Sequence, residues 1–350
     1  MSNLLIELVI TDIRNETSDT RSYILDAAGG ELPNYKAGQF LTFVFPHKLN
    51  ENRRSYSISS APSLKEPLTI TVKRVDNGEF SRYLFDYCTI GSPLFTIGPS
   101  GFFVLPERPE AFSTFVFYAA GSGIAPILPL IKTLLVQHPD VSVVLIYSNH
   151  SVERTIFLEA IRTLEMRFPN RFRTEWLFSD ARNLLRARLS KYLVEEQLND
   201  RRLMDKGTAM FYMCGPHDYM QMITITLLRE GVGAERIRKE IFDTYKPVLR
   251  ELPPDTEPHA VKITYRNETM VFDVRYPDTI LSVAKRNGVV LPYSCEAGKC
   301  GTCAATCVSG AVWMSSNEVL LDKELAEGRV LTCTGYPVHG DVELIIPSST

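Results

Sequence analysis

Residues 292–303 read PYSCEAGKCGTC, and a fourth cysteine follows at position 333. The spacing C-x4-C-x2-C-x29-C is one in which four thiolates can surround two irons, three of them from a single loop. Such a loop must wrap closely around a cluster, which Gly298 and Gly301 permit because they lack a Cβ. Their amides can also donate hydrogen bonds to the sulfur atoms of a cluster. The predicted metal ligands are Cys295, Cys300, Cys303 and Cys333.

A structural zinc site or a chance grouping of thiols is the alternative, but zinc sites usually pair two short C-x2-C units and only one is present. Upstream, we expect strands at Val261–Tyr265 and Met270–Val274 and a helix at Thr279–Asn287. This order resembles that of plant-type ferredoxins, and the resemblance covers about residues 259–347. It implies a C-terminal β-grasp ferredoxin domain, residues 259–350, with a 2Fe-2S cluster.

The composition describes a folded globular protein with room for two or three domains in 350 residues. A net charge of −3 gives no broad basic field, so nucleic acid is not an expected partner. No stretch reaches the roughly 20 apolar residues that span a bilayer, and the first residues lack a signal-peptide pattern. We therefore expect no membrane partner and a cytoplasmic location. Cys88 and Cys307 lie outside the ligand spacing and are expected to be ordinary small apolar residues.

Residues 1–108 show short alternating runs punctuated by Gly and Pro, which predict a small antiparallel β-barrel. One helix is expected at Glu79–Tyr87, directly after Asn77 and Gly78. The expected strands are Leu4–Ile10, Arg21–Leu25, Gln39–Phe45, Ser55–Ser59, Leu68–Val75 and Pro93–Ile97.

From about Phe112 apolar strands alternate with longer helices, which is typical of a parallel sheet with crossover helices. We assign this α/β domain to residues 109–243 and a proline-rich linker to residues 244–258, so the predicted fold class is multidomain α+β. The expected strands are Thr114–Ala119, Val141–Tyr147, Arg173–Phe178 and Ala209–Cys214. The expected helices include Ile127–Gln137, Ile156–Met166, Arg188–Glu196 and Tyr219–Glu230.

An R-x-Y-S motif, residues 54–57, lies on one of the barrel strands. A guanidinium can hold a phosphate, an aromatic ring can pack on an isoalloxazine face, and a hydroxyl can bond a ring nitrogen. Some twenty residues later, a strand end and a helix start supply free amides that bind anions such as a pyrophosphate. A surface arginine and a core tyrosine are the alternative for the motif in isolation. The predicted flavin-binding residues are Arg54, Tyr56, Ser57, Val72, Val75, Gly78, Phe80 and Ser81.

The first strand of the α/β domain ends in GSGIAP, residues 121–126, a glycine loop that leads into a helix where a parallel sheet binds phosphates. A proline in the first helical turn loses no needed hydrogen bond. A later strand ends in CGP, residues 214–216, and a buried strand-end thiol is the alternative for its cysteine. The predicted nucleotide-binding residues are Gly121, Ser122, Gly123, Ile124, Pro126, Ser148, Asn149, Cys214, Gly215, Pro216 and Asp218.

With AGQF at residues 37–40 and GPSGF at residues 98–102, these segments resemble the ferredoxin-NADP reductase superfamily. The resemblance implies an FAD-binding barrel domain, residues 1–108, before the NAD(P)-binding domain. It also implies that Cys214 lies near the nicotinamide and that Phe242, in an E-x-F segment, faces the flavin. The catalytic residues are therefore expected to be Ser57, Cys214 and Phe242, with ordinary packing as the alternative for Phe242.

The choice between NADH and NADPH, and between FAD and FMN, depends on a few individual residues. His150 and Asp180 stand where NADPH-using relatives often have Arg, which favours NADH slightly, whereas Arg154 and Arg182 could restore a phosphate site. Phthalate-type relatives use FMN and most others use FAD, and the segment around Gly78 fits a pyrophosphate, so we expect FAD.

The domain order resembles the reductase components of bacterial multicomponent oxygenases, the group that includes the phthalate dioxygenase and phenylacetyl-CoA epoxidase reductases. It implies that NAD(P)H gives a hydride to FAD, which passes electrons singly through the 2Fe-2S cluster to a separate oxygenase, an aromatic or acyl-CoA mono- or dioxygenase. A general NAD(P)H:ferredoxin or flavodoxin reductase is one alternative, and a redox-sensing or electron-transfer protein without turnover is the other. An acidic face is a candidate docking surface, although such runs are usually only solvated; it comprises Glu318, Asp322, Glu324 and Glu327.

Overall fold

The chain, studied as a computed structural model, divides by its contacts into two compact units. The first is Met1–Pro99 with Phe103–Glu240, and the second is Ser100–Phe102 with Ile241–Thr350. The GPSGF segment is thus shared between the two units. The structure describes residues 5–46, 51–182, 187–200, 205–242 and 251–347. Leu4 of the expected first strand and residues 244–250 of the predicted linker lie outside the described residues.

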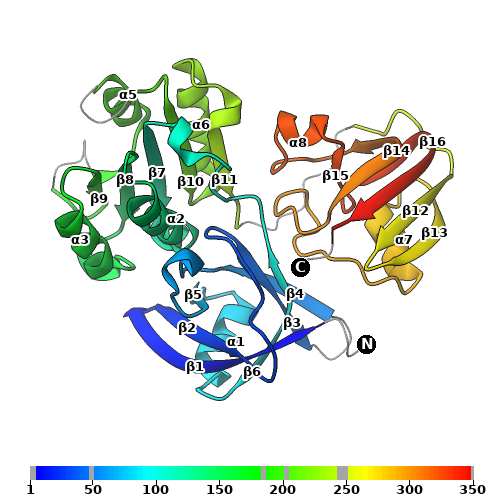
Figure 1. Cartoon of the computed structure of the whole chain (residues 1–350), viewed down its shortest axis with the longest axis horizontal. Coiled ribbons are helices and arrows are strands. Elements are labelled where there is room, and N and C mark those ends of the chain that lie inside the picture. The colour runs from blue at the N-terminus through cyan, green and yellow to red at the C-terminus, as the bar shows by residue number, and fades with distance from the viewer. Residues whose placement is uncertain (1–4, 47–50, 183–186, 201–204, 243–250, 348–350) are drawn as a thin grey trace. The chain divides into compact units, whose positions relative to one another are not determined.

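The N-terminal part of the first unit is an antiparallel sheet with strand order β4-β3-β6-β1-β2-β5 (Figure 1). An antiparallel bridge between Ile58 and Ile70 joins the chain after β4 to β5, at the opposite end of the strand order, and so curls the sheet. This architecture confirms the predicted antiparallel barrel, and α1 has the predicted bounds, Glu79–Tyr87. The strands are β1 Ile6–Thr17, β2 Thr20–Ala27, β3 Phe40–Pro46, β4 Glu51–Ser57, β5 Thr69–Lys73 and β6 Pro93–Ser100.

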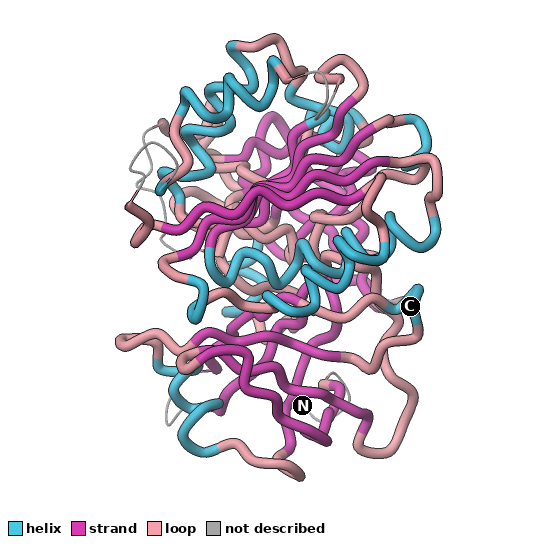
Figure 2. Tube along the Cα trace, turned by 90° about the vertical axis from the view of Figure 1, so that its left-hand side faces the viewer, coloured by secondary structure: helices cyan, strands magenta, loops and turns pink. Residues whose placement is uncertain are grey.

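The rest of the first unit is a parallel sheet with strand order β11-β10-β7-β8-β9, and Figure 2 shows helices on both of its faces. This confirms the predicted α/β fold. The strands are β7 Thr114–Ala120, β8 Ser142–Asn149, β9 Phe172–Phe178, β10 Ala209–Cys214 and β11 Ile237–Glu240. The helices are α2 Ile124–Gln137, α3 Leu158–Arg167, α5 Lys191–Asn199 and α6 His217–Arg229.

All four helices of the parallel-sheet domain start two or three residues away from the predicted positions, and the two largest differences have local causes. Helix α2 begins three residues early, because Pro126 falls in its first turn, where a missing N–H costs nothing. Helix α5 begins three residues late, because the Ser190 side chain caps it by accepting a hydrogen bond from Leu193 N at 3.3 Å. Sequence periodicity locates such helices but not the caps that bound them.

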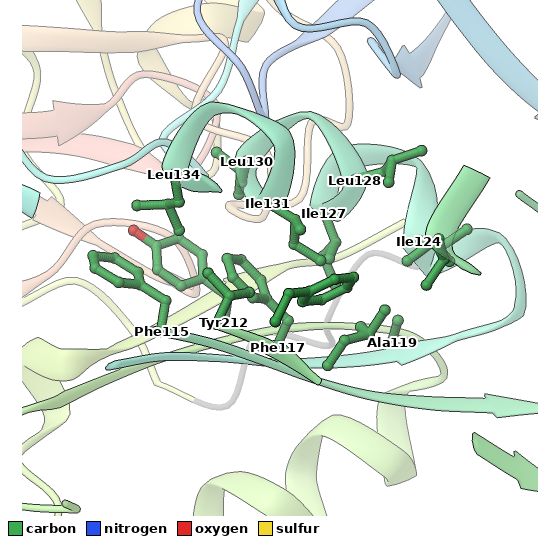
Figure 3. Packing of buried hydrophobic residues seen from close by; sticks show 14 of the residues in the cluster. Phe115, Phe117, Ala119, Ile124, Ile127, Leu128, Leu130, Ile131, Leu134 and Tyr212 are labelled. Atoms are coloured by element: carbon green, nitrogen blue, oxygen red, sulfur yellow. The ribbon is translucent and has the colours of Figure 1, made fainter. Parts of the chain in front are cut away.

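The core of the parallel sheet lies under α2. Figure 3 shows that this helix turns one face toward the sheet, where its aliphatic side chains meet the rings of Phe115, Phe117 and Tyr212. The ring centroids of Phe117 and Tyr212 lie 5.3 Å apart, and Tyr212 donates its hydroxyl hydrogen bond to Val104 O at 2.8 Å. Each fully buried aliphatic side chain contributes about 1.5–3 kcal/mol, so this helix is firmly held over the sheet. Its N-terminus is thereby fixed at the end of β7.

The second unit contains a five-stranded mixed sheet with order β13-β12-β16-β14-β15. Strand β12 is parallel to β16 and antiparallel to β13, and α7 packs against the sheet, which is the predicted β-grasp arrangement. The strands are β12 His259–Tyr265, β13 Glu268–Val274, β14 Ala304–Met314, β15 Arg329–Leu331 and β16 Gly335–Ile346. The helices are α7 Ile280–Arg286 and α8 Asp322–Ala326.

Within the described ranges, the structure has no helix with the length and apolar character that crossing a membrane requires.

Candidate flavin, nucleotide and cluster sites

The nucleotide loop lies where the strand order of the parallel sheet reverses. Strands β8 and β9 follow β7 on one side and β10 and β11 lie on the other, so the crevice at the carboxyl ends of β7 and β10 is the switch point at which such sheets bind ligands. The loop after β7 and the loop after β10 meet there. A Cβ on Gly123 would lie 2.0 Å from Cys214 O, and one on Gly215 would lie 2.9 Å from Ala120 Cβ. The glycines therefore make the close approach possible.

The predicted nucleotide residues gather at this edge. Tyr147 holds the loop after β7 in place, because its hydroxyl donates a hydrogen bond to Gly121 O at 3.0 Å. Helix α2 has no side-chain cap, and its first amide, Ile124 N, donates to Gly121 O and Ser122 O in the turn that precedes the helix. The ends of β7 and β10 and the starts of α2 and α6 carry Gly121, Ser122, Gly123, Ile124, Pro126, Cys214, Gly215, Pro216 and Asp218. Ser148 and Asn149 end the adjacent strand β8.

Two predicted catalytic residues meet around a third side chain, Glu240. Cys214 and Glu240 are register partners at the carboxyl ends of the parallel strands β10 and β11. Ser57, the last residue of β4, donates its hydroxyl hydrogen bond to Glu240 Oε1 at 3.0 Å. All three are buried, and Cys214 is completely so. The contact joins the barrel to the parallel sheet within the first unit.

Burial dominates the electrostatics of this group. Burial raises the pKa of Glu240 to about 8, and the hydrogen bond from Ser57 opposes that rise only in part. Its Oε2 atom is buried without a hydrogen-bond partner. The pKa of the Cys214 thiol is raised well above its usual value, mainly by burial and to a smaller extent by the nearby Glu240 carboxyl group. At neutral pH the site therefore holds a protonated carboxyl group and a neutral thiol.

Glu240 is absent from the predicted site residues. The E-x-F segment drew attention to Phe242, and the four residues of β11, IRKE, carry three charges and lack the apolar pattern of a buried strand. These four residues are recognised as a strand only from their pairing with β10 in the structure. Glu240 could have been predicted as a site residue because it is the first residue of the E-x-F segment. Phe242 is 44% exposed and belongs to the second unit, so its predicted position facing the flavin stays a prediction.

The predicted flavin residues line the edge strand β4 and the turn before α1. Arg54 is exposed on β4, while Tyr56 packs on the barrel core with its ring centroid 6.3 Å from that of Phe43. Burial raises the pKa of Tyr56, so its phenol stays neutral. The Phe80 ring, at the start of α1, packs 4.6 Å from Phe45.

The turn before α1 is closed by one of its own predicted ligands. Ser81 Oγ accepts a hydrogen bond from Val75 N and donates one to Gly78 O, both at 3.1 Å. A Cβ on Gly78 would lie 2.5 Å from Ser81 Oγ, so this position needs glycine. Val75 is exposed here, and Val72 is buried in the barrel core. The hydroxyl therefore shapes the turn, and α1 starts without a side-chain cap on its first amides.

The four predicted metal ligands come together in the second unit. Cys295 contacts both Cys300 and Cys333, and Cys303 contacts Cys333. The contact with Cys300 lowers the pKa of Cys295, and the contact with Cys295 raises the pKa of Cys300. Among the described residues, no three His, Cys, Asp or Glu side chains are arranged around the position of a single metal ion. The four thiols instead form one chain of contacts, from Cys300 through Cys295 and Cys333 to Cys303.

The backbone of the cluster loop matches the wrapping expected from the sequence. Gly298 and Gly301 have φ values of +75° and +76°, a backbone conformation that is unfavourable for residues with a Cβ. Amides turn toward the sulfur atoms, as Ala297 N donates to Cys295 Sγ at 3.4 Å. Cys307 lies apart on β14 and donates to Ser309 O at 3.4 Å. Four thiols and inward-pointing amides are the donor set that a 2Fe-2S cluster requires.

The first unit likewise fits its two organic cofactors. The carboxyl oxygen of Glu240 left without a partner beside Ser57 can meet a polar ligand, and the glycine cradle formed by Gly123 and Gly215 would be filled by any Cβ. The start of α1, which has no side-chain cap, suits a pyrophosphate.

A flavin barrel, a nucleotide-binding parallel sheet and a ferredoxin-type domain in one chain define an NAD(P)H-dependent oxidoreductase of the ferredoxin-NADP reductase superfamily. Three family models match in that order. They are the oxidoreductase FAD-binding domain over residues 7–105, the oxidoreductase NAD-binding domain over residues 117–224, and the 2Fe-2S iron-sulfur cluster binding domain over residues 263–338. The matches confirm the predicted cofactors FAD, NAD(P)H and a 2Fe-2S cluster.

The chain belongs to the family of oxygenase reductase components. It is 31% identical over 358 residues to the ferredoxin reductase component of 3-ketosteroid-9-alpha-monooxygenase from Mycolicibacterium smegmatis, covering 97% of this chain and 96% of that one. It is 28% identical over 348 residues to one component of the 1,2-phenylacetyl-CoA epoxidase from Escherichia coli K12, covering 96% of each chain. Phthalate dioxygenase reductase shares the fold, with a TM-score of 0.61 at 24% identity over 98% of each chain. The predicted family is thereby confirmed.

Proposed function

We propose that this chain is the reductase component of an oxygenase system, taking a hydride from NADH and delivering single electrons to a separate oxygenase. The observation that carries the proposal is the meeting of Ser57, Glu240 and Cys214 at the switch point of the parallel sheet. This meeting supports a hydride path between the flavin strand and the nucleotide loop. FAD, when bound, supplies the exchange between two-electron and one-electron chemistry.

In this proposal the chain's own residues position the cofactors and exclude water and extra charge from the site. The Ser57 hydroxyl, held by Glu240, is presented to the flavin ring edge from the end of β4. Glu240, protonated at neutral pH, keeps the site free of an extra negative charge. The neutral Cys214 thiol, completely buried beside Glu240, keeps water and charge away from the end of β10, where the nucleotide loop lies. Arg54 and the turn from Gly78 to Ser81 would hold the flavin phosphates.

The test is anaerobic stopped-flow mixing with NADH, recording flavin bleaching and then the cluster spectrum. Ser57→Ala should slow flavin bleaching roughly 100-fold, because the hydroxyl that Glu240 holds at the flavin ring edge is lost. Ser59→Ala is the matched control, since this serine is also buried but bonds Thr71 instead, with 2.7 Å between the two hydroxyls. No reduction of cytochrome c by NADH or NADPH, despite bound flavin, would contradict the proposal.

The side chains at the ends of β8 and β9 support NADH over NADPH. His150 Nδ1 lies 3.0 Å from Ser179 Oγ, and Asp180 N donates to His150 O at 3.2 Å. These contacts keep the Asp180 residue beside His150, at an edge where the 2′-phosphate of NADPH would need cations. We expect a higher kcat/KM with NADH, and a clear preference for NADPH would contradict this assignment.

The oxygenase partner is supported by the family and by domain order. Proteins that match nearly the whole chain serve, by their names, a ketosteroid monooxygenase and a phenylacetyl-CoA epoxidase. An aromatic or acyl-CoA oxygenase is therefore the expected class of acceptor. Purified candidate oxygenases should reoxidise the reduced cluster in a mixing experiment, and reoxidation by ferredoxin or flavodoxin alone would favour a general reductase.

A further inference from the structure

A loop of the second unit that holds no cysteine, residues 315–320, supports the cluster loop; we term it the bracing loop. Ser315 N donates to Thr334 O at 2.9 Å, and Thr334 Oγ1 donates to Ser316 O at 2.8 Å, which ties the bracing loop to the residue beside Cys333. Glu318 N donates to Gly298 O at 3.0 Å, which ties it to the cluster loop. The bracing loop therefore links the segment of the first three ligands to that of the fourth.

The two loops meet most closely at Gly298. A Cβ on Gly298 would lie 2.6 Å from Ser316 O, so no side chain separates the backbones. Asn317 holds the bracing loop in shape, because its Oδ1 accepts from Leu320 N at 2.8 Å and its Nδ2 donates to Leu320 O at 2.9 Å. This fixed geometry places Glu318 beside the residue after Gly298, which is Lys299.

Lys299 is a buried cation between two ligand positions. Its backbone amide bonds the sulfur of Cys295, and its side chain is only 7% exposed. Lys299 Nζ lies 4.0 Å from Glu318 Oε1, whose side chain is 33% exposed. Water and salt screen charges on exposed side chains, whereas they screen a buried charge much less. Lys299 adjoins the ligand Cys300 in the chain, so its weakly screened charge lies in the cluster loop, and Glu318 offsets part of that charge.

We propose that the Lys299–Glu318 pair sets the reduction potential of the cluster, with Lys299 favouring the reduced form and Glu318 limiting that preference. The inference rests on the proposed function, in which the cluster takes one electron at a time from the flavin. That electron makes the cluster one unit more negative, and no bond or proton needs to change. An ammonium group stabilises the added charge and a carboxylate opposes it. Both residues act by position, not as ligands.

The experiment is an EPR-monitored redox titration of the cluster in the full-length protein. Lys299→Gln should lower the midpoint potential and Glu318→Gln should raise it. Each should change the ratio of reduced to oxidised cluster about tenfold at the wild-type midpoint, which is about 59 mV for a one-electron couple. The double variant should return toward the wild-type value. A role in structure alone would shift both single variants the same way or neither.

Two controls separate charge from disturbance of the loop. Lys323 and Glu327 form an ion pair in the same unit, but their side chains are 76% and 56% exposed, so Lys323→Gln and Glu327→Gln should leave the potential unchanged. Lys299→Arg keeps the charge and should keep the potential.

Failure of the Lys299–Glu318 inference can be told apart from failure of the cluster assignment. Shifts of the same sign in Lys299→Gln and Glu318→Gln, no shift in either, or equal shifts at the exposed pair would overturn the inference. A wild-type protein without a rhombic 2Fe-2S signal after anaerobic reconstitution would instead overturn the cluster assignment, and with it the proposed function.

Discussion

Glu240 is buried and has an incomplete set of hydrogen bonds, and both affect stability. Its pKa in the folded protein is about 8, against 4.5 for an exposed glutamate. The folded state therefore binds this proton more tightly than the unfolded state does. The stabilising contribution is fully present below pH 4.5 and is lost as the pH rises through about 8, because unfolding then releases a proton.

We predict that Glu240→Gln removes this dependence. The variant should gain stability relative to wild type as the pH rises from 5 to 9, by an amount that reaches a few kcal/mol, since each pKa unit is worth about 1.4 kcal/mol. Thermal unfolding measured across this pH range is the test, with the exposed Glu7→Gln as the control. A constant difference between wild type and Glu240→Gln at every pH would show that Glu240 does not titrate in this range.

At the scale of elements, the contact between the loops after β7 and β10 depends on one missing methyl group. Gly123 has an ordinary helical backbone, with φ of −62°, so alanine would meet no backbone strain there. Its Cβ would instead collide with Cys214 O, a backbone atom that cannot rotate away. The loops would have to separate.

We predict that Gly123→Ala destabilises the protein by about 1–3 kcal/mol, as over-packing does, and weakens NAD⁺ binding at least tenfold. Gly30→Ala is the matched control, because a Cβ there has nothing within 4 Å. Thermal unfolding and equilibrium titration with NAD⁺ report the two effects. Unchanged binding in a destabilised Gly123→Ala protein would separate the loop contact from the nucleotide site.

Elements with a strong local pattern were predictable to the residue. Helix α1 and strand β10 have their predicted bounds, since Gly78 and Gly215 interrupt the apolar pattern at their ends. Strand β11 was not predictable, because its charged side chains form a strand only through pairing with β10. The same limit applies to the site: Ser57 and Cys214 lie in recognisable motifs, whereas their meeting at Glu240 depends on contacts between residues 183 positions apart.

At the scale of the whole molecule, the two units carry separate cofactors, so loss of the cluster should leave flavin reduction intact. We predict that Cys303→Ser abolishes the 2Fe-2S signal and lowers cytochrome c reduction by NADH at least tenfold. Ferricyanide reduction should continue, because a flavin can serve this small acceptor directly. Cys307→Ser is the matched control, as this thiol lies outside the group of four contacting thiols and donates to Ser309 O. Loss of the cluster in Cys307→Ser would contradict the ligand assignment.

Strand β11 is short, lies at the edge of its sheet and is the last element of the first unit. Its four residues are paired on one side only, with β10, and the chain passes from Glu240 directly into the second unit. The chain thus leaves the first unit at the residue that accepts the hydrogen bond from Ser57. Because β11 is held in its sheet by pairing with β10 alone, loss of that one ladder would also separate Glu240 from Cys214.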